Sequence, residues 1–250
     1  FYLQDLSKTG YVGFKNYYYL FNERNFLSSL ITTLIFVISI ILFTVTLGLA
    51  LSVLLNQDFY GKGLTRILVI SPFLVAPTVA AGIWKLMLMS PTFGLFKWVS
   101  KSFGYNPIDW FGDLPLFSII IIVCWQWLPF ALLILLTALQ SLPKDQVEAA
   151  RIDGANELQI FISITINHLK RPIAIVIMLE TIFVLNLFAH IYSTTNGGPG
   201  NATTNLPYLI YQKALLDYDV GGAAAGGIIA VIFANIVAFF LLSFLSKNIN

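Results

Sequence analysis

Residues 148–155 read EAARIDGA, a charged and small-residue segment that lies between two long apolar runs. Pro143 precedes it at a position that the first turn of a helix accepts, and Glu148 would lie near the positive end of the helix dipole. Gly154 can take the left-handed conformation that ends a helix at little steric cost. The segment therefore predicts a short helix that ends at Gly154 and a second helix that begins near Asn156.

The segment contains three alanines, which have almost no side chain: Ala149, Ala150 and Ala155. A helix that presents alanines can approach another surface closely, which suits a docking element. An ordinary loop between two helices is the alternative interpretation.

The sequence around these alanines follows an extended pattern. EAA at 148–150 is followed by Asp-Gly-Ala at 153–155 and then by Phe161, Ile164-Thr165 and Pro172. This pattern resembles the EAA motif of permease subunits in binding-protein-dependent ABC importers, although that family usually has proline where this chain has Asn167. Asparagine can also end a helix, so we expect the turn at Asn167 to persist.

The resemblance implies that residues 141–171 form a cytoplasmic coupling region. In that region a set of six residues would dock on a cytoplasmic ATPase subunit: Glu148, Ala149, Ala150, Asp153, Gly154 and Ala155.

Composition indicates an integral membrane protein. Of the 250 residues, 58% are hydrophobic and 10% are charged, with a mean hydropathy of +0.82, whereas a soluble domain carries about 25% charged residues. The single cysteine, Cys124, lies inside an apolar run and excludes a disulfide framework or a cysteine metal cluster. A net charge of +2 with scattered basic residues does not indicate nucleic-acid binding.

We expect an all-α fold, a polytopic transmembrane helix bundle with about five spans and the ABC type I importer permease architecture that the resemblance implies. The expected spans are 26–55, 64–89, 115–139, 173–192 and 223–245, each long enough for the roughly 20 residues that cross a bilayer. Prolines inside the second and third spans predict kinks. Residues 1–250 would form a single permease domain, with 194–222 as an external loop rich in glycine and proline.

Basic residues favour a cytoplasmic position for the coupling region. That side would hold Lys62, Arg66, Lys144, Arg151, Lys170, Arg171 and Lys247, against Lys97, Lys101 and Lys213 in the opposite loops. Adding Lys8, Lys15 and Arg24 of the N-terminal segment reduces this difference to seven against six. Because the sequence begins at Phe1 without methionine, we expect an additional N-terminal span upstream, which would return the N-terminus to the cytoplasm.

Polar side chains inside spans are costly in hydrocarbon and usually face a partner or an aqueous cavity. Asn186 and His190 would share one face of the fourth span, with Phe183 close to that face. Sugars and polyols need hydrogen-bond donors and acceptors together, which these two side chains offer. Asn186 also lies where the related maltose-type permeases have asparagines that contact sugar. A hydrogen bond between helices is the alternative role for each side chain.

Glu180 and a Trp-Gln-Trp segment complete the candidates for the substrate path. Glu180 is the acidic residue inside the fourth span and points about 120 degrees away from Asn186, so it either contacts a neighbouring helix or subunit or lines the path. Trp125 could stack on a sugar and Gln126 could offer a polar contact. Adjacent helical residues do not all face one cavity, so packing or the membrane boundary is expected for Trp125 or Trp127.

The sequence offers no catalytic constellation. The loop NGGPGNATT at 196–204 lacks the lysine of a phosphate-binding loop, so ATP hydrolysis is expected in another chain. His168 and His190 lack the spacing of a metal pair. An intramembrane enzyme would need paired groups, and Glu180 and His190 fall on different faces. We expect no enzyme activity and no cofactor or metal bound by this chain.

The segments TTNGGPG (194–200), LPYLIY (206–211) and DYDVG (217–221) are most similar to those of sugar-importing permeases, especially the sorbitol and mannitol type. This resemblance implies a multi-pass permease in the inner or plasma membrane of a prokaryote, surrounded by lipid, that imports a sugar or polyol. Its partners would be a second homologous permease, two ATPase subunits that use ATP and Mg, and an external solute-binding protein. An ion-coupled secondary transporter or a channel is the alternative, although neither would need a docking helix.

Overall fold

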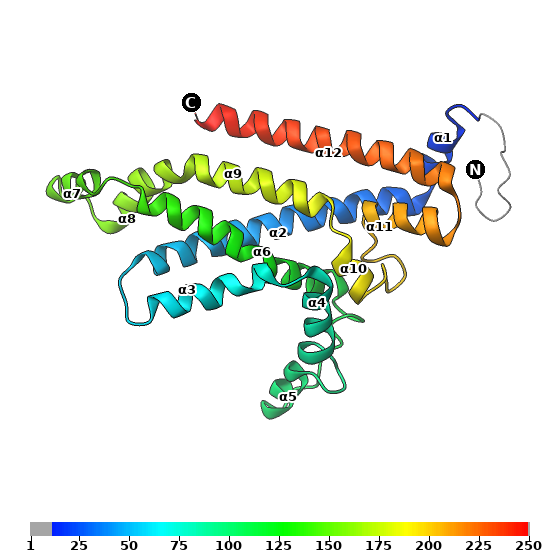
Figure 1. Ribbon diagram of the computed structural model, residues 1–250, viewed down its shortest axis with the longest axis horizontal. Helices are drawn as coiled ribbons and strands as arrows, with labels where there is room; N and C mark the ends of the chain where they lie inside the picture. The colour runs from blue at the N-terminus through cyan, green and yellow to red at the C-terminus, as the bar shows by residue number, and fades with distance from the viewer. Residues whose placement is uncertain (1–11, 250) are drawn as a thin grey trace. The chain divides into compact units, whose positions relative to one another are not determined.

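The computed structural model describes the backbone of residues 12–249 and the side chains of residues 12–240. Within this part of the chain the elements are helices, and no strand occurs among them, which confirms the predicted all-α class (Figure 1). The chain divides into two compact units. Unit 1 comprises Phe1–Ile40, Ala76–Val123 and Ile182–Phe239, and unit 2 comprises Ile41–Val75, Cys124–Thr181 and Phe240–Asn250.

Three helices are long and apolar enough to cross a membrane: α2 (Arg24–Asn56), α6 (Pro115–Gln140) and the segment Val220–Phe240 of α12 (Val220–Ile249). They correspond to the first, third and fifth expected spans. Their sequences carry apolar residues on every side, as helices surrounded by lipid or protein do.

The second expected span is interrupted. It consists of α3 (Lys62–Ile70) with η1 (Ser71–Leu74), followed by α4 (Pro77–Gly82) with η2 (Ile83–Leu88), and it makes a fourth candidate span only if the two halves are counted together. Pro72 and Pro77 lie at the starts of η1 and α4, so proline breaks the helix where the sequence predicts a kink.

The expected fourth span, 173–192, does not form one helix. The described residues give three candidate spans, or four when the bent pair is counted as one, in place of the five expected. Helix α9 runs from Ile166 to Leu185, and the separate short helix α10 (Ala189–Thr194) follows a turn at residues 186–188. The prediction of a helix end at Asn167 is also wrong, because the Asn167 carboxamide donates to the Ser163 carbonyl inside the helical run.

The segment between the second and third expected spans and the expected external loop 194–222 both contain helices. Residues 90–114 include α5 (Leu95–Ser102), and residues 194–222 include α11 (Leu206–Tyr211) and the π-helix η4 (Gln212–Leu216). The start of α11 is buried, so this glycine-rich and proline-rich segment is a packed part of unit 1 as well as a connection.

Unit 1 has a core in which α1 (Lys15–Asn22), the first part of α2, α11 and α12 meet: Leu20, Phe26, Leu206 and Leu209, with Ile229 and Phe233 packed against them. The ion pair between Lys213 and Glu23, at 2.6 Å, adds a contact between η4 and the turn before α2. Lys85 of η2 donates to the Thr194 carbonyl at 2.5 Å, where α4 packs against α10.

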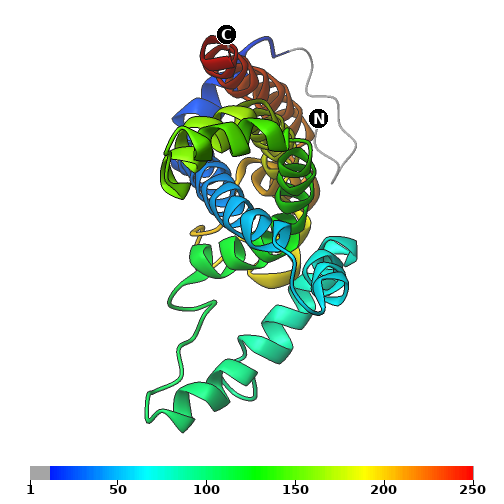
Figure 2. The same cartoon turned by 90° about the vertical axis from the view of Figure 1, so that its left-hand side faces the viewer.

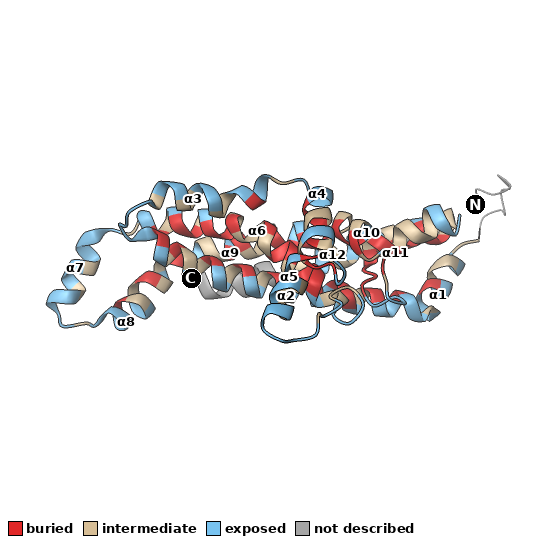
Figure 3. Cartoon of the chain, turned by 90° about the horizontal axis from the view of Figure 1, so that it is seen from below, coloured by how far each residue is buried: buried red, intermediate tan, exposed pale blue. Residues whose placement is uncertain are grey.

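Unit 2 is built from the second part of α2 with α6 and α9, and Figure 3 shows the buried positions along α6 and α9. Ala131, Leu135 and Val176 form one of its buried clusters. A Cβ atom at Gly48 would lie 2.9 Å from Ala131 Cβ, so glycine permits the close approach of α2 to α6.

Candidate functional site

The EAA segment forms the short helix α7 (Lys144–Ile152), with Pro143 at its N-cap. Asp153 is the C-cap, Gly154 has a φ of 87°, and the Ala155 amide donates to the Ala150 carbonyl at 2.9 Å. This hydrogen bond closes the helix end around a left-handed residue, which glycine favours. The predicted helix and its stop at Gly154 are confirmed.

The second predicted helix is confirmed as well. Helix α8 (Glu157–Ile160) begins after Asn156, whose side chain accepts from the Gln159 amide at 2.9 Å, while the Gln159 side chain accepts from the Asn156 amide at 2.8 Å. This reciprocal capping box fixes the start of the helix. The π-helix η3 (Phe161–Thr165) joins α8 to α9, so the chain is helical from Glu157 to Leu185.

Helices α7 and α8 lie at one end of unit 2, between the end of α6 and the start of α9 (Figures 1 and 2). Glu148, Ala149, Asp153 and Gly154 are exposed, and Ala150 and Ala155 are half-buried. Arg151 pairs with Glu157 at 3.0 Å and ties α7 to α8.

Helices α7 and α8 and the turn between them form an elbow, residues 144–160. Two large apolar side chains on this elbow are exposed to solvent. Ile152 is 86% exposed and Leu158 is 66% exposed. Figure 3 shows the exposed colouring along α7 and α8. This end of unit 2 also carries charged side chains and a capped helix start.

A polar cavity of about 440 Å³ lies beside α7, within unit 2. It is lined by nine residues: Asn56, Asp58, Leu139, Gln140, Leu142, Lys144, Val147, Glu148 and Arg151. Asp58 also pairs with Lys62 at 3.0 Å, and this hydrogen bond and charge hold the pKa of Asp58 below its ordinary value. The cavity therefore offers groups of both charge signs next to Glu148.

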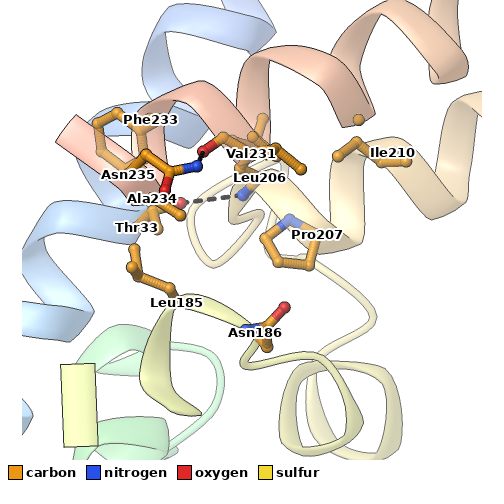
Figure 4. Close-up of a pocket in the computed structure, with 12 residues that line it drawn as sticks. Thr33, Leu185, Asn186, Leu206, Pro207, Ile210, Val231, Phe233, Ala234 and Asn235 are labelled. Atoms are coloured by element: carbon orange, nitrogen blue, oxygen red, sulfur yellow. Dashed lines mark hydrogen bonds between the residues drawn. The ribbon is translucent and has the colours of Figure 1, made fainter. Parts of the chain in front are cut away.

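A second cavity, of about 500 Å³, lies within unit 1 (Figure 4). Its walls come from α2, the end of α9, α11 and α12, and its lining residues are Thr33, Leu185, Asn186, Leu206, Pro207, Ile210, Gly227, Ala230, Val231, Phe233, Ala234 and Asn235. Asn186, a predicted path residue, contributes to this lining.

Asn235 is a residue of this cavity that the sequence interpretation missed. It is a carboxamide inside the last apolar helix, at a position where a polar group is costly in hydrocarbon. The free-energy cost of a polar group in hydrocarbon, which identified Asn186 as a candidate, would also have identified Asn235.

The predicted shared face of Asn186 and His190 is wrong, because the helix breaks between them. Asn186 is exposed in the turn after α9, whereas His190 is buried in α10, with 4% of its surface exposed. Phe183 is 52% exposed on α9 and is absent from the residues that line the unit 1 cavity. The structure thus brings one of these three residues to the cavity.

The Trp-Gln-Trp segment lies on α6 and lines neither cavity. Gln126 is buried and its carboxamide donates to the Val75 carbonyl at 2.5 Å within unit 2. The Trp127 ring lies edge-on to Phe73 and Phe130, with centroids 5.6 and 5.7 Å away. These contacts give Gln126 and Trp127 packing partners, and Trp125 is half-buried.

Glu180 is fully buried on α9 against α2. The Thr44 hydroxyl donates to Glu180 Oε2 at 2.5 Å, and both residues lie in unit 2 with no exposed surface. Among the described residues, Glu180 Oε1 has no hydrogen-bond partner. Glu180 therefore joins two neighbouring helices and lies outside the unit 1 cavity.

Two known transport permeases are similar in sequence to this chain. The chain is 37% identical over 216 residues to the trehalose/maltose transport system permease protein MalF of Thermococcus litoralis, covering 85% of this chain and 73% of that protein. It is 30% identical over 246 residues to the sn-glycerol-3-phosphate transport system permease protein UgpA of Rhizobium meliloti, covering 97% and 83%.

A solved structure shares the fold. A chain of a bacterial alginate ABC transporter, crystallised with an alginate pentasaccharide-bound periplasmic protein, superposes with a TM-score of 0.84 at 22% identity over 96% of this chain and 85% of that chain. Residues 21–250 match the family described as binding-protein-dependent transport system inner membrane component. The chain therefore belongs to this family of ABC transporter permeases.

Proposed function

We propose that this chain is one of two membrane-spanning subunits of an ATP-driven importer of carbohydrate, either a sugar or a polyol. The observation that carries the proposal is the exposed elbow of α7 and α8. Its alanines, its carboxylates, which include Glu148 and Asp153, and its solvent-facing Ile152 and Leu158 form a surface with both apolar and charged groups. A cytoplasmic ATPase subunit that covers this surface would remove the apolar side chains from water.

The connection of the elbow to the rest of the chain suits a coupling role. The helical run from Glu157 to Leu185 begins at the elbow and ends next to Asn186. A displacement of α8 can therefore travel along one continuous helix, because packed helices move as rigid elements. The pair of Arg151 with Glu157 joins α7 to α8, and the capping box at Asn156 fixes the start of α8.

The energy needed for this switch sets a requirement on the docked surface. Shifting a two-state equilibrium from 1:99 to 99:1 takes about 5.5 kcal/mol of differential affinity. One exposed ion pair contributes about 0–1 kcal/mol, whereas burial of a large aliphatic side chain contributes about 1.5–3 kcal/mol. Ile152, Leu158 and several polar contacts reach this magnitude when they form in one of the two states and are absent in the other.

The relatives support the carbohydrate part of the proposal. One is named as a trehalose/maltose permease, and a structure with the same fold belongs to an alginate transporter. In this proposal the chain acts in the inner membrane of a prokaryote with a second homologous permease, two ATPase subunits and an external solute-binding protein. The ATPase subunits use ATP and Mg, and this chain binds no cofactor of its own.

The proposal is tested by purifying the tagged chain from its native membrane and identifying the proteins that accompany it. We expect a second permease and an ATPase, and we expect Ala149→Trp to release the ATPase because a large ring prevents close approach of α7. Ala50→Trp is the matched control, since Ala50 is also an exposed helical alanine of unit 2 but lies on α2. Recovery of the chain without an ATPase, or equal ATPase recovery with both variants, would overturn the coupling assignment.

A further inference from the structure

We propose that the unit 1 cavity binds the transported solute as an uncharged, polyhydroxylated molecule through the carboxamides of Asn186 and Asn235, and that it rejects phosphate esters. This inference rests on the proposed function, because it names the class of solute that the importer moves. It adds Asn235 of α12 as a residue that determines specificity.

The size of the cavity fits a small carbohydrate. Its volume of about 500 Å³ lies within the roughly 300–1,000 Å³ of small-molecule sites. Three positions on α12 that face it have little or no side chain, namely Gly227, Ala230 and Ala234. A Cβ atom at Gly227 would meet no atom within 4 Å, so this wall leaves room for a solute.

The two carboxamides keep hydrogen-bonding capacity for a solute. Asn186 Nδ2 donates to the Ile182 carbonyl and Asn235 Nδ2 donates to the Val231 carbonyl, both at 2.8 Å (Figure 4 draws the second). A carboxamide has two N–H donors and one carbonyl acceptor. Each side chain therefore retains one donor and its acceptor, and a sugar hydroxyl, which both donates and accepts, complements this combination.

The apolar part of the lining suits the carbon skeleton of the same solute. Leu185, Ile210 and Val231 supply aliphatic surface, and Phe233 supplies an aromatic ring. Sugars and polyols carry C–H groups beside their hydroxyls, and sites for small molecules combine an apolar lining with few oriented polar groups.

The described lining has no group that would balance a phosphate charge. None of its twelve residues is Lys, Arg or His. Proteins hold phosphate with arginine forks or lysine charges, and the lining offers neither. Asn186 and Asn235 are neutral, so they recognise hydroxyls without this charge compensation.

The start of α11, which borders the cavity, has no free amide for an anion. The Leu206 amide donates to Thr33 Oγ1 at 3.0 Å, the Tyr208 amide donates to Asn205 Oδ1 at 3.1 Å, and the Leu209 amide donates to the Asn205 carbonyl at 2.9 Å. Pro207 has no amide hydrogen. The usual backbone donors for phosphate at a helix start are therefore already occupied.

The test uses the importer with its co-purified partners in proteoliposomes, with ATP supplied to the ATPase side and the solute-binding protein on the other. Radiolabelled sorbitol, mannitol, maltose and trehalose are compared with sn-glycerol 3-phosphate. We expect at least one neutral solute to be taken up about tenfold faster than the phosphate ester, because the lining contains no cationic side chain to hold the phosphate. Faster uptake of the phosphate ester would overturn the inference while leaving the proposed importer function intact.

Leucine substitutions then test the two carboxamides. Asn186→Leu and Asn235→Leu should each lower the maximal uptake rate of the neutral solute by about tenfold or more. Asn22→Leu is the matched control, because Asn22 Nδ2 makes the same bond to the Tyr18 carbonyl, also at 2.8 Å, on α1 and away from the cavity lining. Wild-type uptake by Asn235→Leu would refute its role.

Two further measurements separate the possible failures. Asn235→Ser keeps a donor and an acceptor, so it should retain more uptake than Asn235→Leu when equal amounts of assembled complex are compared. Loss of the assembled complex would identify a folding defect. If no solute moves with ATP, the proposed function fails, and binding of tritiated sorbitol and maltose to the purified complex by equilibrium dialysis tests the cavity alone. Loss of that binding in both leucine variants supports the inference, and unchanged binding overturns it.

Discussion

Replacement of Gly154 isolates the contribution of the α7 turn to transport. The residue has a φ of 87°, and a Cβ atom there would meet nothing within 4 Å, so Gly154→Ala adds backbone strain without a clash. The left-handed conformation costs a residue with a Cβ about 1–2 kcal/mol. A cost of this size lowers the population of the native turn by a factor of roughly 5–30. Gly154→Asn should cost less, because asparagine tolerates this conformation.

Gly154→Pro should have the largest effect of the series. Proline fixes φ near −65° and removes the amide that Gly154 donates to the Arg151 carbonyl at 3.1 Å. The expected order of ATP-driven uptake is therefore wild type, Asn, Ala and Pro. We expect uptake to fall along this series while the amount of assembled protein in the membrane stays constant.

Gly61 provides a matched control in the turn before α3. Its φ is 84° and an added methyl group would also meet open space there, so Gly61→Ala carries the same backbone cost as Gly154→Ala. The assay measures ATP-driven uptake and ATPase activity in the assembled complex for both variants. Equal losses of uptake in the two variants, or wild-type uptake by Gly154→Pro, would refute the reasoning that the α7 turn transmits motion.

Two further predictions concern the packing of unit 2. Thr44→Val should lower the free energy of unfolding by about 1–2 kcal/mol in detergent, because it removes the hydroxyl that donates to buried Glu180 Oε2 at 2.5 Å. Denaturant titrations of Thr44→Val, Glu180→Leu and the double variant measure the coupling energy between the two residues. A coupling energy of zero would contradict the prediction. Gly48→Ala should destabilise the chain by about 1–2 kcal/mol through its clash with Ala131, whereas Gly63→Ala, which has open space on α3, should be neutral or stabilising by up to about 1 kcal/mol. Equal melting temperatures of the two alanine variants would refute the close approach of α2 to α6.

Local signals were enough to predict helices α7 and α8. Proline before α7, glycine after it and asparagine before α8 act within one or two turns of the helices that they start or end. The ends of α2 and α6 were also predictable to within two residues, because long apolar runs end where polar residues begin.

The break after α9 was not predictable from local sequence. Residues 186–188 contain neither glycine nor proline, and the apolar pattern continues through them. The break is supported by a distant residue, since the Asn205 carboxamide donates to the Leu187 carbonyl. A hydrogen bond to a backbone carbonyl from a residue that is distant in sequence does not change the helical pattern of apolar residues. The sequence interpretation therefore wrongly placed Asn186 and His190 on one helix face.

Tertiary contacts also determine which residues line the unit 1 cavity. Thr33 of α2 accepts from the Leu206 amide and fixes α11 beside α2, which forms one wall. Asn235 reaches this cavity from α12, nearly fifty positions after Asn186 in the sequence. Sequence spacing cannot relate residues on different helices, although it correctly marked Asn186 as unusual.

We propose that ATP hydrolysis by a partner subunit drives uptake through this chain. The most direct measurement compares solute uptake in proteoliposomes that hold the purified complex, with ATP, with a non-hydrolysable ATP analogue, or with imposed proton and sodium gradients in place of nucleotide. We expect accumulation with ATP only. Uptake that follows an ion gradient, or equilibrates solute without nucleotide, would contradict ATP-driven import and indicate a secondary transporter or a channel.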